Sequence, residues 1–423
     1  MRTKVGSGIA ALSPLAVFLV AYLVSSLVAG DFYRVPIAAV FLLACVWAVI
    51  IAPGPLAERI ETFSRGAGHP NVLLMIWIFL LAGAFAGTAK DIGAIDATVA
   101  LTLGIVPPGM MFAGMFLTAC FISMAVGTSV GTIVALVPIG AGLAQASGVA
   151  PAYMAAIIVG GAFFGDNLSF ISDTTIAATR AAGCEMRDKF RTNLRIIAPA
   201  VVVVTAIYLF QGRSVADFDA PAAVNWVKIL PYLLIIVLAL LGRNVTLVLS
   251  LGILANAVIG FVAGDFSWVG WLESAGKGIA GMSDLIIVTL LAGGLLEMIR
   301  AGGGLDLIIT SLTRHISSKR GAKATIAALV SLANVCTANN TIAIITTGGI
   351  ARELADRYRV DPRKTASILD TFSCLIQGML PYGAQLLMAA GLTGLSPAAI
   401  IPFLYYPFVM GLCAILAIVF QKD

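Results

Sequence analysis

Long apolar stretches separated by short polar segments run along the whole chain. A helix needs about 20 apolar residues to cross the hydrocarbon core of a bilayer. The pattern predicts ten such spans, over residues 8–30, 35–53, 72–89, 153–180, 193–211, 225–241, 244–264, 282–299, 364–393 and 399–420. We therefore expect an all-α polytopic membrane protein.

Two further apolar stretches, 109–148 and 322–356, are too long for one crossing. Small polar residues interrupt each near its middle, at Gly127–Thr132 and at Thr337–Thr341. Non-helical backbone at membrane depth is tolerated where it is buried in protein or lines a wet cavity. We expect both stretches to be re-entrant helical hairpins.

The charges that flank 322–356 support this expectation. Basic residues lie on both sides of it, at Arg314, Lys319, Arg320 and Lys323 before, and at Arg352, Arg357, Arg359, Arg363 and Lys364 after. Lys and Arg prefer cytoplasmic loops, so both flanks fall on the same side of the membrane. The tip of this hairpin is expected at Asn339 and Asn340, and 109–148 is expected to enter from outside.

Composition agrees with a membrane protein. Only 11% of the 423 residues are charged, against about 25% in ordinary soluble domains. Ten spans and two hairpins place both termini in the cytoplasm, with 21 of the 26 Lys and Arg residues on the inside. The net charge of +5 then reflects basic cytoplasmic loops, and we expect the inner (cytoplasmic) membrane and its lipid, with no nucleic acid partner.

The second half of the sequence repeats the first. Leu80–Gly83 recurs as Leu290–Gly293, and further on an offset of 211 matches Pro151 with Pro362. Five spans and one hairpin per half force the second half to be inverted, and inverted repeats with broken helices are typical of secondary transporters. The expected domains are two repeats at 1–211 and 225–423, a connecting loop at 212–224, and a transport core of hairpins 109–148 and 322–356 with broken helices 153–180 and 364–393.

The segment Gly165–Thr175 places two aspartates, Asp166 and Asp173, in this apolar setting. An ionised Asp at the bilayer centre costs at least about 2.5–3.5 kcal/mol, so a cation is expected to neutralise it. Na⁺ prefers several oxygen ligands, and an unwound turn offers bare carbonyls. The expected Na⁺/H⁺ site consists of Thr128, Ser129 and Thr132 from the hairpin tip and Asp166, Asn167, Ser169, Ser172, Asp173 and Thr174. An alternative is that the aspartates cap the half-helix after the break.

Inversion predicts a second pocket without a carboxylate, which offers amides to a neutral or anionic group. Its expected residues are Asn339, Asn340, Thr341, Gln377, Tyr382 and Gln385.

The proton is expected to travel on a carboxyl group. Both histidines, His69 and His315, fall in loops, and no Lys or Arg lies deep within a proposed span. The proton sites left are Asp166, Asp173, Glu297 and Asp370. A surface pair with Arg300 is the alternative for Glu297, and helix packing for Asp370. Because burial favours the neutral carboxyl and a cation favours the ionised one, one group holds either ion. We expect Asp166→Asn and Asp173→Asn each to abolish transport.

The stretches Gly127–Thr132 and Gly165–Thr175 resemble the two signature motifs of the NhaC family of Na⁺/H⁺ antiporters. The resemblance implies an elevator-type carrier whose hairpin tips bind the coupling ions, and by analogy a homodimer. The tip Asn339–Thr341 is similar to the Ser-Asn-Thr tips of sodium-coupled dicarboxylate carriers in the same superfamily. Phe170 stands where NhaC members usually have Pro, so the helix break depends on Gly165, Asp166 and the hydroxyl cluster.

Two functions follow from these observations. The favoured one is Na⁺/H⁺ exchange at midplane aspartates. The alternative is a Na⁺-coupled carrier of a small amino acid or carboxylate, because NhaC relatives include such carriers. An enzyme is not expected, since the sequence has no His/Glu metal spacing, no nucleophile with a base and no phosphate loop. No cofactor is expected apart from Na⁺ as a transported or coupling ion.

Overall fold

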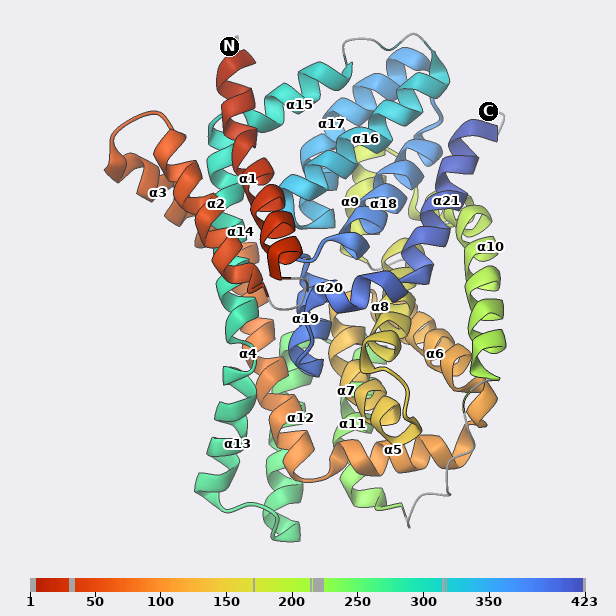
Figure 1. Ribbon diagram of the computed structural model, residues 1–423. Coiled ribbons are helices and arrows are strands. Elements are labelled where there is room, and N and C mark those ends of the chain that lie inside the picture. The colour runs from red at the N-terminus through yellow and green to blue at the C-terminus, as the bar shows by residue number, and fades with distance from the viewer. Residues whose placement is uncertain are drawn as a thin grey trace.

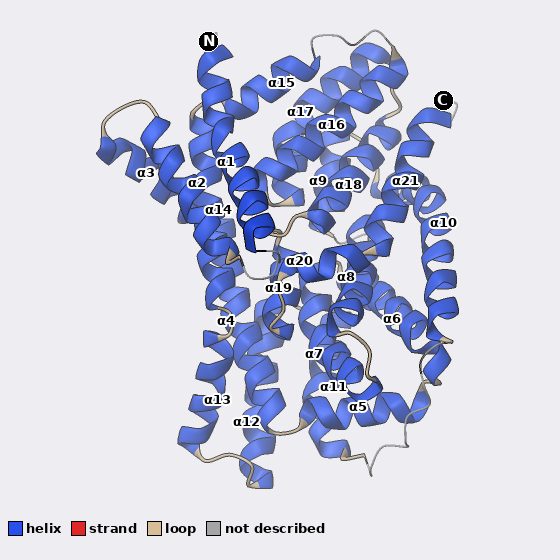
Figure 2. Cartoon of the chain, viewed as in Figure 1, coloured by secondary structure: helices blue, strands red, loops and turns tan. Residues whose placement is uncertain are grey.

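The structure, a computed structural model, describes residues 5–29, 35–169, 172–213, 215, 224–313, 316 and 318–420. Within these ranges the chain forms helices, turns and loops and no strand (Figure 2). Eight of the described helices are long and apolar enough to cross a membrane, or up to ten if each of two bent helix pairs is one span. The expected all-α polytopic membrane protein is confirmed.

Ten α-helices form the first half. They are α1 (Val5–Ala29), α2 (Ile37–Ile51), α3 (Leu56–Ala67), α4 (Pro70–Asp91), α5 (Ala94–Ile105), α6 (Met111–Val126), α7 (Ser129–Ser147), α8 (Pro151–Leu168), α9 (Asp173–Ala182) and α10 (Met186–Gly212). A short 3-10 helix, η1 (Pro108–Met110), precedes α6.

The second half follows the same order. Its helices are α11 (Trp226–Leu240), α12 (Val245–Ala263), α13 (Trp268–Ala280), α14 (Ser283–Ala301), α15 (Gly304–Thr313), α16 (Lys319–Thr337), α17 (Asn340–Tyr358), α18 (Pro362–Met379), α19 (Ala384–Thr393), α20 (Pro397–Ile400), η2 (Ile401–Phe403) and α21 (Tyr405–Phe420). Adding 211 to the bounds of α7, α8 and α9 gives those of α17, α18 and α19. The orientation of the halves in a membrane stays a prediction.

Hydropathy did not predict the short helices α3, α5, α13 and α15. They have 12, 12, 13 and 10 residues, too few to cross a bilayer. In α3, charged side chains such as Glu58 and Arg65 interrupt the apolar run, and the helix packs one face on α14.

Both expected hairpins turn where small polar residues interrupt the apolar run. The pair α6–α7 turns at Gly127 with φ 74°, and α16–α17 turns at Ala338 with φ 48°. Side chains cap the second helix of each pair, because Asn339 Oδ1 accepts from Ile342 N at 3.0 Å and Thr128 Oγ1 from Gly131 N at 3.5 Å. Figure 1 shows α16–α17 in the upper half of the view and α6–α7 in the lower half.

The two broken helices lie between these hairpins. Helix α8 ends at Leu168 and α9 begins at Asp173, while α18 ends at Met379 and α19 begins at Ala384. Phe170 lies outside the described residues. Residues 151–182 are the most deeply buried of the span candidates, and α8 packs on α6, α7, α10, α18, α19 and α21. The C-terminal end of α8 is therefore enclosed by both halves of the chain.

Candidate functional site

Asp166 lies in the last turn of α8 and is 4% exposed. Its Oδ1 accepts a hydrogen bond from Ser129 N at 3.1 Å, and its Oδ2 accepts one from Ser129 Oγ at 2.6 Å. Ser129 is the first residue of α7, so its N–H has no partner within that helix. The start of a helix also carries partial positive charge. The hairpin tip thus holds the Asp166 carboxylate from one side.

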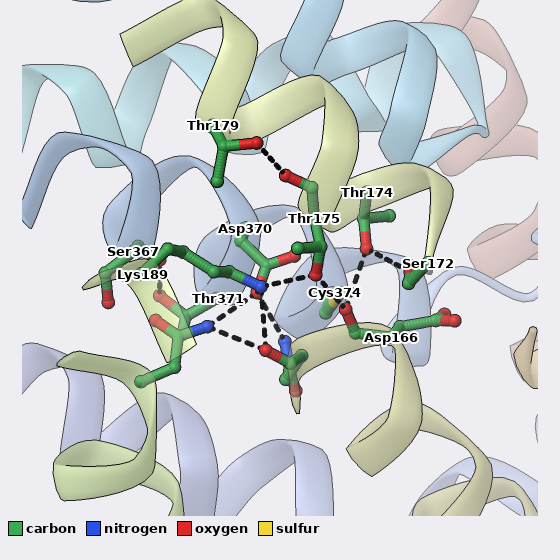
Figure 3. A network of polar contacts seen from close by, with 12 residues as sticks. Asp166, Ser172, Thr174, Thr175, Thr179, Lys189, Ser367, Asp370, Thr371 and Cys374 are labelled. Carbon is green, nitrogen blue, oxygen red and sulfur yellow. Dashed lines mark hydrogen bonds and ion pairs between the residues drawn. The ribbon is translucent and has the colours of Figure 1, made fainter. Parts of the chain in front are cut away.

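Protein donors satisfy the carbonyls at the end of α8. Thr174 Oγ1 donates to Asp166 O at 2.8 Å, and Lys189 Nζ and Asn193 Nδ2 donate to Asn167 O at 2.7 and 2.9 Å. Figure 3 shows this network, with the Asp166 side chain pointing away from Lys189. The expectation that the break offers bare carbonyls is therefore wrong for Asp166 and Asn167.

Lys189 corrects a second expectation. The sequence predicted no Lys or Arg deep within a span, and Lys189 lies before the span expected at 193–211. In the structure it belongs to α10, its side chain is 1% exposed, and its Nζ lies 2.8 Å from Asp370 Oδ2. Its third contact is with Thr175 Oγ1 at 2.7 Å.

Asp370, on α18, is fully buried. Besides Lys189, its Oδ2 accepts from Asn193 Nδ2 at 2.8 Å and from Asn167 Nδ2 at 3.3 Å. Tyr406 adds a further contact to this group, because its hydroxyl donates to Asn167 Oδ1 at 3.2 Å. Sequence reasoning weighed Asp370 as a packing group or a proton site; the structure makes it one half of a buried ion pair.

The two predicted pockets share one hydroxyl. Gln385 Nε2 donates to Ser129 Oγ at 2.9 Å, so an amide of α19 contacts the group that holds Asp166. Gln377 Nε2 donates to Gln385 Oε1 and to Ala338 O, both at 3.0 Å. A continuous polar chain therefore joins the two hairpin tips through the broken helices.

Other residues of the predicted second pocket contact backbone or each other. Tyr382 donates to Val335 O at 2.8 Å, and Asn340 Oδ1 accepts from Thr341 N at 3.0 Å. Asn340 Nδ2 contacts Cys374 Sγ at 3.8 Å.

Several residues of the predicted cation cage have a different environment from Asp166. Asp173 is exposed, as the first residue of α9. Thr132 Oγ1 donates to Thr128 O at 3.0 Å within its own helix, and the Ser172 and Thr174 hydroxyls contact each other at 2.8 Å. Ser169 is buried next to the break. One aspartate, not two, is thus buried at this break.

The remaining titratable candidates lie apart from this break. Glu297 is 27% exposed and its Oε2 lies 4.0 Å from Arg300 Nη1. His69 is exposed and caps α4, where its Nδ1 accepts from Asn71 N at 3.2 Å. His315 lies outside the described residues.

A helical period in the sequence could have located Lys189. The buried face of α10 carries Ala200, Val204 and Tyr208, and the same face about two and three turns earlier presents Asn193 and Lys189. A window of average hydropathy leaves Lys189 outside the expected span 193–211, because Arg187, Asp188 and Arg191 surround it. The positions i and i+4 nevertheless share one side of the helix.

The comparisons with known proteins agree with this architecture. The model of the Na⁺/H⁺ antiporter family matches residues 4–213 and 222–421. The chain belongs to this family. The Na⁺/H⁺ antiporter NhaC of Alkalihalophilus pseudofirmus is 26% identical over 81% of this chain and 80% of its own length, which confirms the resemblance to NhaC. The family consists of membrane transporters, not enzymes.

Two relatives have other names. The malate-2H⁺/Na⁺-lactate antiporter of Bacillus subtilis is 26% identical over 81% of this chain and 80% of that protein. The arginine/ornithine antiporter ArcD of Halobacterium salinarum is 23% identical over 80% of this chain and 76% of that protein. Family membership therefore leaves the transported solute open.

Proposed function

We propose that this protein exchanges Na⁺ for H⁺ across the membrane and that Asp166 carries either ion. The supporting observation is a charge imbalance at the break in α8. Lys189 neutralises Asp370 at 2.8 Å, whereas no ion pair reaches Asp166 within the part of the chain that the structure describes. A buried carboxylate without a cation is costly and must be neutralised. A proton and Na⁺ each supply the missing charge.

Exchange follows from competition for one group. With a proton on Asp166, the cluster of Asp166, Asp370 and Lys189 is neutral; with Na⁺ at the same carboxylate it is neutral again. The Ser129 hydroxyl, 2.6 Å from Asp166 Oδ2, would supply a further oxygen to a Na⁺ shell. The empty, ionised form keeps one uncompensated buried charge. Its cost disfavours movement across the membrane without an ion, which couples the two fluxes.

The proposal is tested in sealed vesicles that contain the purified protein and a pH-sensitive dye. Na⁺ added outside an acid-loaded interior should alkalinise that interior with no organic solute present. Asp166→Asn should reduce the signal to that of protein-free vesicles, while the matched control Asp96→Asn, at an exposed carboxylate of α5, should leave it intact. Exchange that survives Asp166→Asn at the rate of the unmodified protein would contradict the proposal.

A second candidate is Na⁺-coupled transport of a small amino acid or carboxylate. The amide chain of Gln377 and Gln385 supports it, because Gln377 Oε1 is buried without a hydrogen-bond partner and is available to a solute donor. The names of the malate–lactate and arginine/ornithine antiporters point the same way. The same vesicles separate the candidates: no pH change until malate, lactate or an amino acid is added would favour the second.

A further inference from the structure

The Lys189 ammonium occupies an oxygen cage at the centre of the protein. A lysine has three N–H donors and no acceptor, and each donor finds one oxygen here. These oxygens are Asp370 Oδ2 at 2.8 Å, Asn167 O at 2.7 Å and Thr175 Oγ1 at 2.7 Å. They come from α18, α8 and α9, while Lys189 itself comes from α10. Four helices thus converge on one positive charge.

Two side chains next to the ammonium, Asp370 and Asn193, each carry one oxygen without a hydrogen-bond partner. These atoms, Asp370 Oδ1 and Asn193 Oδ1, are both buried. The other polar atoms of these two side chains bond to each other, because Asn193 Nδ2 donates to Asp370 Oδ2 at 2.8 Å. Buried polar atoms without a partner are rare in native proteins and call for an explanation. A carboxylate, a helix-end carbonyl, a hydroxyl and a side-chain amide are the ligand types that hard cations select.

We propose that this cage is a second alkali-cation site, filled by the chain's own Lys189 ammonium. The tethered charge stands where a second Na⁺ would bind and limits the protein to one Na⁺, at Asp166. The inference rests on the proposed function of Asp166 and deepens it, because it assigns the number of ions bound per chain to one side chain. A simple structural ion pair would need only Asp370 near Lys189, whereas here a helix-end carbonyl and a hydroxyl also contact the ammonium.

Removal of the ammonium turns the cage into a vacant site. Lys189→Ala leaves Asp370 ionised and buried without its partner, which is strongly unfavourable, and creates space where the ammonium was. A free monovalent cation restores the charge balance and meets the same three oxygens. Na⁺ is the cation to be tested. Choline, a cation too large to enter the cage, is the comparison.

The experiment counts radioactive Na⁺ bound at saturation per purified chain in detergent. We expect one for the unmodified protein, none for Asp166→Asn, two for Lys189→Ala and one for Asp166→Asn with Lys189→Ala. A further Asp370→Asn substitution should return this double variant to none. Lys90→Ala, which removes an exposed lysine at the end of α4, is the matched control and should stay at one.

The two proposals fail differently in this series. If the Asp166 proposal is wrong, Asp166→Asn will leave the number of bound Na⁺ ions unchanged, with either Lys or Ala at position 189. If the Lys189 proposal is wrong, Lys189→Ala will add no bound Na⁺, either to the unmodified protein or to the Asp166→Asn variant. Folding is followed at the same time, because Lys189→Ala should unfold at a higher temperature in NaCl than in choline chloride. A variant that is equally unstable in both salts, or cannot be recovered in either, would overturn the proposal.

Discussion

Gly165 links the packing of α8 to the position of Asp166, which follows it directly. A Cβ added at residue 165 would lie 2.1 Å from Ser123 Oγ, 2.2 Å from the Ser123 carbonyl carbon and 2.4 Å from its oxygen. Ordinary contact begins at 3.4 Å, so α6 and α8 would have to separate by 3.4 − 2.2 = 1.2 Å at this point. A change of the Ser123 rotamer does not relieve a contact with backbone.

The expected effect of Gly165→Ala combines three contributions. Overpacking of a close contact costs about 1–3 kcal/mol. Separation also weakens the bond that Ser123 Oγ donates to Ala162 O at 2.5 Å, worth about 0.5–1.5 kcal/mol. Alanine also restricts the unfolded chain, which stabilises the folded protein by about 0.4–1 kcal/mol. The net loss of stability from these three contributions is about 1–4 kcal/mol. The same separation displaces Asp166 relative to Ser129.

Thermal unfolding of the purified protein in detergent measures the stability loss, and vesicle transport measures the apparent Na⁺ affinity. The matched control is Gly349→Ala in α17, where an added Cβ meets no atom within 4 Å. We expect a lower unfolding midpoint and weaker Na⁺ affinity for Gly165→Ala, and an unchanged or raised midpoint for the control. Equal midpoints for the two variants would refute the close approach of α6 to α8 and the geometry it imposes on the site.

Two further predictions concern the polar contacts of the site. Ser129→Ala removes the hydroxyl oxygen that would complete the Na⁺ shell at Asp166. Because a polar contact to a charged group is worth about 1.5–3 kcal/mol, the Na⁺ concentration for half-maximal exchange should rise about 10- to 100-fold. The control is Ser147→Ala, whose hydroxyl bonds only to carbonyls of its own helix. An unchanged Na⁺ dependence would exclude Ser129 from the site. Lys189→Met and Asp370→Leu should each cost about 3–5 kcal/mol, and the double variant clearly less than their sum. Additive losses of thermal stability would show that the two side chains are not paired.

The regular features of the fold were predictable because each has a local cause. Apolar runs of span length, interrupted by Gly127–Thr132 and Thr337–Thr341, predict helices that turn, and the structure turns at Gly127 and Ala338. The breaks in 153–180 and 364–393 likewise fall inside the expected ranges. Short helices such as α5 were not predicted, because its 12 residues are fewer than the roughly 20 that a membrane span requires.

The charge arrangement was only partly predictable. Asp166 and Asp173 lie in one motif, but the break between them lets the chain change direction, so the sequence does not tell which of them is buried. Lys189 and Asp370 are 181 residues apart, and a pair of this kind exists only when α10 and α18 meet. The neighbours of Lys189 along the chain are charged, whereas its burial depends on the face of α10 that it occupies.

The contacts of Ser129 link ion binding to the relation between the two halves. A hydroxyl has one donor and two acceptor lone pairs; here the donor serves Asp166, and one lone pair receives Gln385 Nε2 at 2.9 Å. Na⁺ bound at Asp166, as proposed, would need oxygen lone pairs and not donors, so its arrival would turn the Ser129 proton away from the carboxylate. This rotation redirects the lone pair that Gln385 contacts, and Gln385 in turn contacts Gln377, which donates to the opposite tip at Ala338 O. If Asp166 exchanges a proton for Na⁺ as proposed, a contact between α7 and α19 changes. These helices belong to different halves of the chain, so occupancy of the proposed site would bias their relative position.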